Sequence, residues 1–169
     1  ADTFQLKNPG GLSFSPNAGD LLAQLKAYYL LGEASGTRVD SQGGNDLTDN
    51  ATVTQAAGKV GNAAQFTRAN AEYLSKADTA DLRTGDIDFS LVAWVYLDSK
   101  PAGRMGIVVK GDGQLGAADT EYNLYWENTN DRFTIHLVEA AGAGKVVYAN
   151  VLGAPALATW YFLAVTYNA

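Results

Sequence analysis

The chain has no cysteine and only one histidine, His136, among its 169 residues. Without cysteine it forms no disulfide, carries no thiolate nucleophile and builds no zinc or iron–sulfur site on sulfur ligands. A single histidine excludes a His-x-x-x-His metal motif, and a Ser-His-Asp triad would have to include His136. The metal that best suits the remaining ligand types is calcium, which takes oxygen ligands.

Positive charge is also scarce, because 12 lysines and arginines stand against 18 aspartates and glutamates, which gives a net charge of −6. Nucleic-acid binding depends on clustered lysine and arginine, so we expect no nucleic-acid partner. The most apolar stretch, residues 21–31, is interrupted by Gln24 and Lys26. It is too short to cross a bilayer, so we expect no membrane insertion.

Only four prolines occur, and two of them, Pro9 and Pro16, lie in the first 19 residues together with several glycines. This composition predicts an extended, turn-rich arm. Asp20 then precedes apolar residues at helical spacing, which predicts one short helix over residues 20–26. We expect a strand over residues 27–31 to follow it.

Beyond this region the apolar residues recur with a period of two. Residues 89–96, 122–127 and 133–138 alternate in this way, and glycine-bearing loops separate them. The run WYFLAVTY, residues 160–167, is apolar on both faces, which is typical of a strand inside a sandwich. Several such strands with aromatic and β-branched residues predict an all-β antiparallel sandwich or barrel.

The order of these segments resembles that of laminin G-like domains, which share the concanavalin A-like lectin/glucanase jelly roll, in the form common in bacterial and phage surface proteins. The segments that carry the resemblance are AYYLLGEASGTRVDSQGGNDLT (27–48), AGKVGNAAQF (57–66), EYLSKAD (72–78), TGDIDFSLVAWVYLDS (84–99), MGIVVKGD (105–112), EYNLYWENTNDRFTIHL (121–137) and WYFLAVTYNA (160–169). The resemblance covers residues 27–169 and implies a two-sheet antiparallel jelly roll there. Residues 1–26 would then form the N-terminal arm and the short helix.

In that family a strand like residues 160–169 is followed by further strands that close the sandwich. The resemblance therefore implies a jelly roll that lacks its last strands, with an open sheet edge of unpaired backbone groups. Residues beyond Ala169, a strand from another chain, or part of the N-terminal arm are the three sources that could cover this edge. We expect the arm or the open edge to contact other subunits of an assembly.

The loop VDSQGGNDLT, residues 39–48, offers Asp40, Asn45 and Asp46 as oxygen ligands around two glycines. Calcium takes about six to eight oxygen ligands, including backbone carbonyls. Some members of the family bind calcium near this position, so calcium is the candidate metal. The alternative is that aspartate, asparagine and glycine simply form a tight turn here.

The run Asp86-Ile87-Asp88-Phe89-Ser90 is similar to a strand motif of the glucanases on this fold, Glu-x-Asp-x-Glu. In that motif the outer carboxylates act as nucleophile and general acid. Ser90 stands where the second glutamate should be. A retaining glycosidase needs two catalytic carboxyl groups about 5–5.5 Å apart. We therefore predict that the chain is not an enzyme.

Sugar-binding sites combine aromatic faces, which stack on sugar rings, with amide and carboxylate hydrogen bonds. One segment offers both kinds of group and supplies the predicted ligand-binding residues: Tyr125, Trp126, Glu127, Asn128, Asn130 and Asp131. Trp126, beside a polar loop, is the predicted stacking platform, whereas Trp94 and Trp160 lie in apolar strands and are predicted to fill the core. The alternative is that the aromatic residues of this segment fill the core as well. His136 is out of phase with its apolar neighbours, which predicts a surface or structural histidine.

The resulting hypothesis is a non-catalytic recognition or adhesion module that binds glycans or a surface protein, outside the cell, on the cell surface or on a virion. It depends on the fold-level resemblance. The alternative is a structural or decoration domain of a virion or cell-surface assembly. A glycan-degrading enzyme is the third hypothesis.

Overall fold

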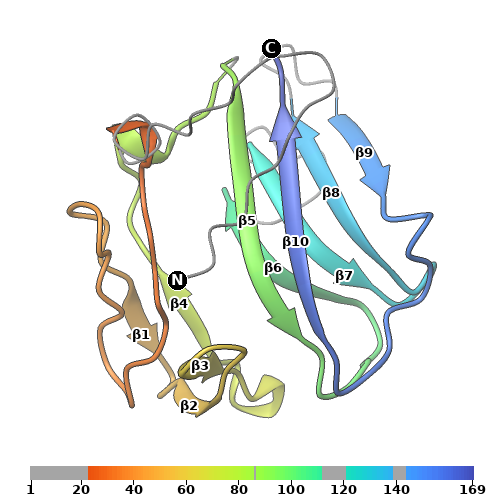
Figure 1. Ribbon diagram of the computed structural model, residues 1–169, viewed down its shortest axis with the longest axis horizontal. Helices are drawn as coiled ribbons and strands as arrows, with labels where there is room; N and C mark the ends of the chain where they lie inside the picture. The colour runs from red at the N-terminus through yellow and green to blue at the C-terminus, as the bar shows by residue number, and fades with distance from the viewer. Residues whose placement is uncertain (1–22, 86, 112–120, 139–143) are drawn as a thin grey trace, which may run out of the picture. The chain divides into compact units, whose positions relative to one another are not determined.

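The computed structural model describes residues 23–85, 87–111, 121–138 and 144–169 (Figure 1). The described residues form ten strands and two short 3-10 helices. The strand pairs β1–β4, β5–β10, β6–β7, β7–β8 and β8–β9 are antiparallel. The predicted all-β fold is therefore confirmed. This part of the chain contains no helix with the length and apolarity that a bilayer crossing requires.

The N-terminal predictions are confirmed only in small part. Residues 1–22, which include the predicted arm, lie outside the described residues, and only residues 23–24 of the predicted helix are seen to be helical. The strand expected over residues 27–31 is wrong, because this segment makes a single isolated bridge, between Tyr29 and Asp40. Strand-forming residues need a paired neighbour to become a strand, and here the pairing does not continue beyond one residue.

The chain divides into two compact units, and each is described by itself. The first unit comprises residues 1–56 and 62–76, and the second comprises residues 57–61 and 77–169. In the first unit, β1 (Thr48–Asn50) pairs with β4 (Tyr73–Ser75), and the 3-10 helix η1 (Arg68–Asn70) precedes β4. Strand β2 (Thr54–Ala57) pairs with β3 (Asn62–Gln65).

The centre of the first unit is a buried arginine rather than an apolar cluster. Arg38 and Val53 are both fully buried. The Arg38 guanidinium donates to the carbonyl oxygens of Gly36 and Val53, the latter at 2.8 Å. Its nitrogens lie 3.9 Å from a Glu33 carboxylate oxygen and 4.0 Å from an Asp49 carboxylate oxygen. These acceptors and negative charges compensate a cation that would be costly to bury alone.

Asp49 also fixes the turn that follows β1. Its carboxylate accepts hydrogen bonds from the backbone N–H groups of Val53 at 2.8 Å and Gly36 at 2.9 Å. The hydrogen bond from Val53 lowers the pKa of Asp49. Ala51 and Thr52 both adopt the left-handed conformation in this turn, with φ of 66°, which is costly for a β-branched residue. The Asp49 and Arg38 contacts hold the strained turn in place.

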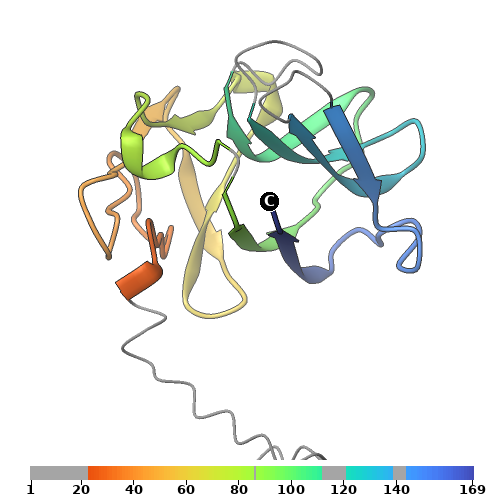
Figure 2. The same ribbon diagram turned by 90° about the horizontal axis from the view of Figure 1, so that it is seen from above.

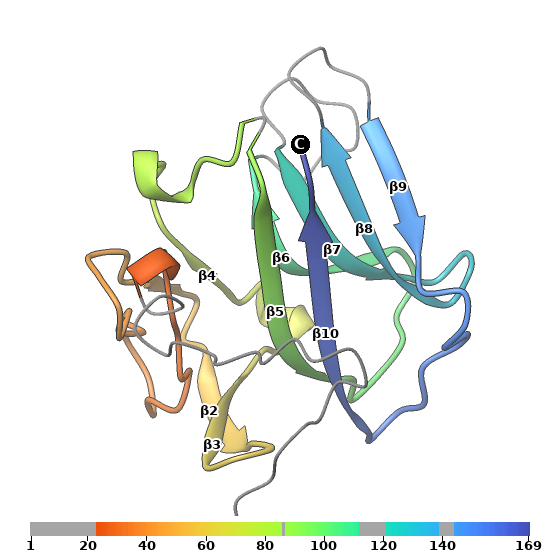
Figure 3. The same cartoon turned by 45° about the horizontal axis from the view of Figure 1, so that its top comes forward.

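The second unit is a two-sheet sandwich. Strand β5 (Phe89–Tyr96) pairs with β10 (Trp160–Tyr167) along their full lengths, and the 3-10 helix η2 (Ala80–Leu82) precedes β5. The other sheet has the order β6 (Arg104–Lys110), β7 (Tyr122–Glu127), β8 (Arg132–Val138) and β9 (Gly144–Tyr148). Figure 2 shows the β5–β10 pair facing the four-stranded sheet, and Figure 3 shows β9 at one edge of that sheet.

The core of the second unit lies between these two sheets. Leu97, Trp126 and Phe133 form one buried cluster, and Tyr122, Leu124 and Ile135 form a second. Alternate residues of β5 and β10 pack against one cluster or the other, among them Leu91, Val95, Tyr161, Leu163 and Val165. The period of two read from the sequence is thus confirmed for β5, β7 and β8.

Candidate ligand-binding face

The four-stranded sheet carries polar side chains on the face that is turned away from the core. In β7, Tyr122, Leu124 and Trp126 point into the core, so the residues between them point to the opposite face. The same alternation applies to β8, where Phe133 and Ile135 are in the core. We call the buried outward-pointing residues of the two central strands the polar face: Asn123, Tyr125, Glu127, Thr134 and His136.

All members of the polar face are buried although they point away from the sandwich core, with exposed fractions between 1% for Thr134 and 7% for Glu127. The outward-pointing residues of the flanking strands are exposed, among them Arg104 on β6 and Val146 and Tyr148 on β9. The outer face of an antiparallel sheet is usually solvated. Burying a polar group costs free energy unless it is hydrogen-bonded, so these side chains need partners within the protein.

Charged side chains flank the polar face in strand register. Glu127 lies directly opposite Arg104 on β6 and Arg132 on β8. The Asn130 amide donates to Glu127 Oε1 at 2.6 Å, and the Arg104 guanidinium lies 5.3 Å from the centre of the Tyr125 ring. These contacts order a carboxylate, an amide, a phenol and a guanidinium beside one another.

Burial and the charge of Arg104 both shift ionisation on this face. Burial raises the pKa of Tyr125, and Arg104 opposes that rise in part. For His136, burial lowers the pKa and the positive charge of Arg104 lowers it further. Because the shift is downward from 6.5, His136 is neutral at pH 7. Each polar-face side chain can therefore act as a hydrogen-bonding group, and Glu127 is the acidic residue among the five.

His136 is held in an unusual position. Its Nδ1 atom is buried and has no hydrogen-bond partner among the residues that the structure describes. Its Nε2 atom lies so close to Gly144 on β9 that any side chain at position 144 would collide with the imidazole ring. A larger residue at this position would therefore force the imidazole ring or the β9 backbone to shift. A buried ring nitrogen without a partner is a candidate contact for a bound ligand.

The predicted ligand-binding residues do not all lie on the polar face, and the prediction that Trp126 is a stacking platform is wrong. Trp126 is 1% exposed and packs in the core against Leu97 and Phe133, so it cannot be a stacking platform. The prediction that Trp94 fills the core is wrong as well, because its side chain is 50% exposed. Trp160 is partly buried on the same outer face of the β5–β10 sheet.

Two further predicted residues have structural contacts away from the polar face. Asp131 accepts a hydrogen bond from Trp126 Nε1 at 2.9 Å and one from Lys100 Nζ at 2.7 Å, and the contact with Lys100 lowers the pKa of Asp131. Asn128 accepts a hydrogen bond from the Gly103 backbone N–H at 3.0 Å. The role of these two residues in ligand binding stays a prediction. Tyr125, Glu127 and Asn130 lie together, and their role in ligand binding stays a prediction.

The loop proposed for calcium is closed by hydrogen bonds to its own backbone. Asp40 is 4% exposed, and its carboxylate accepts from the backbone N–H groups of Tyr28 at 2.8 Å, Gln42 at 3.0 Å and Asn45 at 3.2 Å. Burial acts to raise the pKa of Asp40, but these hydrogen bonds outweigh it and lower the pKa. Asp46 Oδ1 accepts from the Asp40 backbone N–H at 2.9 Å.

This geometry supports the tight-turn alternative for residues 39–48, because the Asp40 oxygens already have backbone donors. Asn45 is also part of the turn, since its amide donates to the Lys26 carbonyl at 3.3 Å. No group of three or more histidine, cysteine, aspartate or glutamate residues in the described ranges is placed to hold a metal ion. Calcium binding by Asp40, Asn45 and Asp46 stays a prediction, which thermal melts with calcium and with a chelator would test.

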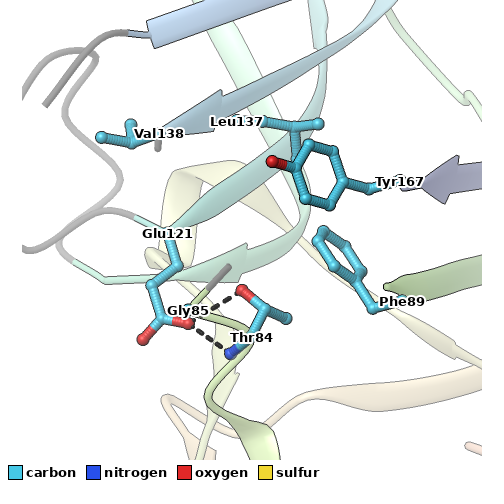
Figure 4. Close-up of a pocket in the computed structure, with 7 residues that line it drawn as sticks. All are labelled: Thr84, Gly85, Phe89, Glu121, Leu137, Val138 and Tyr167. Carbon is cyan, nitrogen blue, oxygen red and sulfur yellow. Dashed lines mark hydrogen bonds between the residues drawn. The ribbon is translucent and has the colours of Figure 1, made fainter. Parts of the chain in front are cut away.

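Figure 4 shows a small cavity at one end of the second unit, lined by Thr84, Gly85, Phe89, Glu121, Leu137, Val138 and Tyr167. Its volume of about 10 Å³ has room for a single water. The Thr84 backbone N–H and hydroxyl both donate to Glu121 Oε2, at 2.6 and 3.0 Å. These bonds tie the segment before β5 to the start of β7, and the cavity is too small for an organic ligand.

The carboxylates do not form a glycosidase pair at the polar face, where Glu127 is the single acidic member. Asp88, in the predicted motif, accepts a hydrogen bond from the Ala169 backbone N–H at 2.9 Å. Asp86 lies outside the described residues. Glycoside hydrolysis needs two carboxyl groups, of which one acts as general acid and the other as nucleophile or general base.

Asn123, Thr134 and His136, which belong to the polar face, are not among the binding residues predicted from the sequence. The signal was present, because these residues are out of phase with the apolar positions of β7 and β8. What it could not reveal is that the outer face is buried. Burial depends on the side chains of neighbouring strands, which the register of the sheet brings together.

Comparison with known proteins identifies the family of this chain. Searches of curated proteins and of solved structures found no match. A model of the concanavalin A-like lectin/glucanases superfamily matches residues 68–169, which is more than half of the chain. This range contains every strand of the two-sheet sandwich, and its antiparallel sheets agree with the family's fold. The chain belongs to the concanavalin A-like lectin/glucanase superfamily.

Proposed function

We propose that the chain is a non-catalytic carbohydrate-recognition module that binds a glycan on the polar face. Membership of a superfamily of lectins and glucanases supports carbohydrate as the ligand class. The observation that carries the proposal is the exposed rim of the polar face, where Arg104 on β6 and Tyr148 on β9 stand beside the buried side chains of Asn123, Tyr125, Glu127, Thr134 and His136. Their positions on the two central strands give the site a rigid base.

The chemistry of these side chains suits sugar hydroxyl groups. A hydroxyl both donates and accepts hydrogen bonds, so it pairs equally well with an amide, a phenol, a carboxylate or a neutral imidazole. Glu127 is an acceptor, Asn123 and Thr134 supply both kinds of group, and His136 Nδ1 is buried without a partner among the described residues. The exposed ring of Tyr148 on β9 could stack on a sugar ring at the edge of the site.

The absence of a carboxylate pair at the polar face supports recognition rather than hydrolysis, because both glycosidase mechanisms use two carboxyl groups. A glycan ligand places the protein where glycans are displayed. We therefore propose that it acts outside the cell, on a cell surface or on a virion.

The proposal predicts that Tyr148→Ala weakens glycan binding about two- to tenfold, because the exposed ring can no longer stack on a sugar. A glycan array first identifies a ligand, and isothermal titration calorimetry then measures the dissociation constant. Tyr73→Ala is the matched control, since it removes an exposed tyrosine ring from the first unit. Equal affinities for both variants and the parent would refute this site, and an array without binding would refute the function.

A second function, a structural or decoration domain of an assembly, is favoured by one observation. The outer face of the β5–β10 sheet exposes aromatic rings in two cross-strand pairs, Trp94 with Phe162 and Tyr96 with Trp160, each with ring centres 5.2 Å apart. The side chains of Trp94 and Phe162 are 50% and 55% exposed. Exposed apolar patches of this kind mark protein interaction surfaces.

If this face binds other subunits, sedimentation velocity should show a concentration-dependent assembly that Phe162→Ser abolishes. The substitution places a polar group at the centre of the exposed patch without changing the core-facing residues of β10. A monomer at every concentration, both alone and mixed with candidate partners, would count against the assembly function.

A further inference from the structure

We propose that the His136 imidazole makes the pairing of β9 with β8 sensitive to pH, so that its protonation in mild acid opens β9 from the edge of the four-stranded sheet. The proposal goes beyond the proposed function and does not depend on it, because its test needs no ligand. It follows from the burial of His136, from the state of its Nδ1 atom and from the position of Gly144.

His136 lies where the edge strand meets the rest of the sheet. It stands directly opposite Asn123 on β7 and Val146 on β9, and it is only 4% exposed. On the β9 side the ring is closed off by Gly144, whose backbone lies so near Nε2 that a Cβ atom would not fit between them. The imidazole therefore fills the space between β8 and the start of β9.

Strand β9 is the part of this sheet that can open most easily. All five of its residues are exposed, and among the described residues it pairs with β8 alone, as Figure 3 shows. None of its residues belongs to the two core clusters found in the described part of the chain. Segments with exposed residues and few core contacts open at a lower free energy than core strands.

Protonation of His136 is unfavourable while β9 is closed. A neutral imidazole carries one N–H group, whereas the protonated ring carries two and a full positive charge. Nδ1 is buried and has no hydrogen-bond partner among the described residues. The protonated ring would therefore bury a charged donor without an acceptor, which costs far more free energy than burying a neutral nitrogen. Opening of β9 removes Gly144 from the ring and lets the charge reach water.

The charged groups on β6 and β7 do not offset this cost. Burial lowers the pKa of His136, and the positive charge of Arg104 on β6 lowers it further. Glu127 shares the face but lies four residues along β7 from Asn123, which is about 13 Å in a strand. Its carboxylate also accepts the hydrogen bond from Asn130. Tyr125, the other ionisable residue of β7 on this face, is neutral near pH 7 because burial raises its pKa.

The remaining neighbours supply no negative charge either. On β8 itself the ionisable residue on the same face is Arg132, a second cation. On β9, Tyr148 shares the face through its pairing with Thr134, whereas Lys145 stands opposite Leu137 in the other phase. The Glu121 carboxylate, just before β7, accepts two hydrogen bonds from Thr84. No carboxylate among the described residues is thus placed to stabilise a protonated His136.

The pH range of the effect follows from the direction of the pKa shift. An exposed histidine has a pKa of 6.5, and His136 in the closed sheet has a lower one. Above pH 6.5 the ring is neutral in both states, so the pairing of β9 keeps its full stability. Between pH 6.5 and the lowered pKa the open state takes up a proton and the closed state does not. Opening then becomes about tenfold more favourable for each pH unit.

Hydrogen exchange of the full chain at pH 7.5, 6.5 and 5.5 tests the proposal. Protection factors correct for the intrinsic effect of pH on exchange, and we expect those of the β9 amides to fall about three- to tenfold between pH 7.5 and 5.5. They should stay below those of β5 at every pH, as a local opening requires. Because His136 is the one histidine in the chain, its imidazole NMR signal gives its titration directly, and the midpoint should lie below pH 6.5.

Three variants separate the imidazole from the strand. His136→Phe keeps a ring and His136→Gln keeps a polar group, but neither takes up a proton, so we expect β9 protection to vary less than about twofold with pH in both. Val146→Ala is the matched control on the opposite strand position. It shortens an exposed β9 side chain and should keep the pH dependence of the parent, whatever its effect on the protection at pH 7.5.

Four results would overturn the proposal. These are an imidazole that titrates at pH 6.5 or above in the folded chain, a β9 protection that does not fall in acid, an equal fall in a histidine variant, and equal protection of β5 and β9, which would mean global opening. If neither histidine variant folds, the imidazole titration and the β9 protection of the parent decide the outcome by themselves.

Discussion

Replacing Trp126 with alanine is expected to lower the free energy of unfolding by about 3–5 kcal/mol, which is typical for the loss of a large buried aromatic side chain. Trp126 is 1% exposed and lies at the centre of the cluster with Leu97 and Phe133. The substitution leaves a cavity between the sheets and removes the hydrogen bond from the indole N–H to Asp131. Urea denaturation, followed by fluorescence and circular dichroism, measures the effect.

Trp94→Ala is the matched control, because it removes the same side chain from the outer face of the same unit. The Trp94 side chain is 50% exposed, and its main ring contact is with Phe162. We expect a loss of about 1 kcal/mol. A Trp126→Ala variant as stable as Trp94→Ala would show that Trp126 is not in the core.

Arg38→Met is expected to destabilise the first unit by about 3–5 kcal/mol, because removing one partner of a buried ionic group leaves the others uncompensated. Arg38 is fully buried and bridges the carbonyl groups of Gly36 and Val53 to the carboxylates of Glu33 and Asp49. Methionine keeps much of the volume and none of the donors. Hydrogen exchange of the backbone amides near Asp49 and Val53 reports the local loss of stability.

Two variants separate the cause from a general effect of charge. Arg38→Lys keeps the positive charge but has a single donor centre, so it cannot serve both carbonyl groups and should remain destabilised. Lys26→Met removes a charge from an exposed position in the same unit and should change stability by no more than about 0.5 kcal/mol. If Arg38→Met exchanged as slowly as the parent, the buried cation would not be what holds the first unit together.

The two outer surfaces of the second unit differ in chemistry, and this supports different functions for them. The polar face presents buried hydrogen-bonding groups between exposed edges, which suits a ligand with many hydroxyl groups. The outer face of the β5–β10 sheet presents paired aromatic rings, which suits an apolar partner. Carbohydrate binding and assembly are therefore tested on separate residues, and one can fail without the other.

The sequence by itself determined the fold class, because strand periodicity and turn residues are local properties. The alternation in residues 122–127 and 133–138 also determined which side chains share a face, including His136 with the polar residues. In residues 89–96 both alternating sets contain large apolar side chains, so the pattern could not decide which set faces the core.

Tertiary structure decided that choice, and it reversed the predicted roles of the tryptophans. The four-stranded sheet packs against the set with Leu91 and Val95, which leaves Trp94 outside, whereas Trp126 follows the phase of Leu124 into the core. The adjacent polar loop suggested exposure for Trp126, but side-chain direction in a strand is set by phase and not by sequence neighbours.

The same distinction applies to the charged residues. The sequence left Asp40 open as a calcium ligand or a turn residue, and only the folded backbone supplied the N–H groups that occupy its carboxylate. Nothing in the sequence marked Arg38 for burial, since arginine is mostly exposed and its compensation comes from groups up to 15 residues away. Local pattern fixes strands and their faces, whereas burial and compensation of charge depend on contacts that exist only after folding.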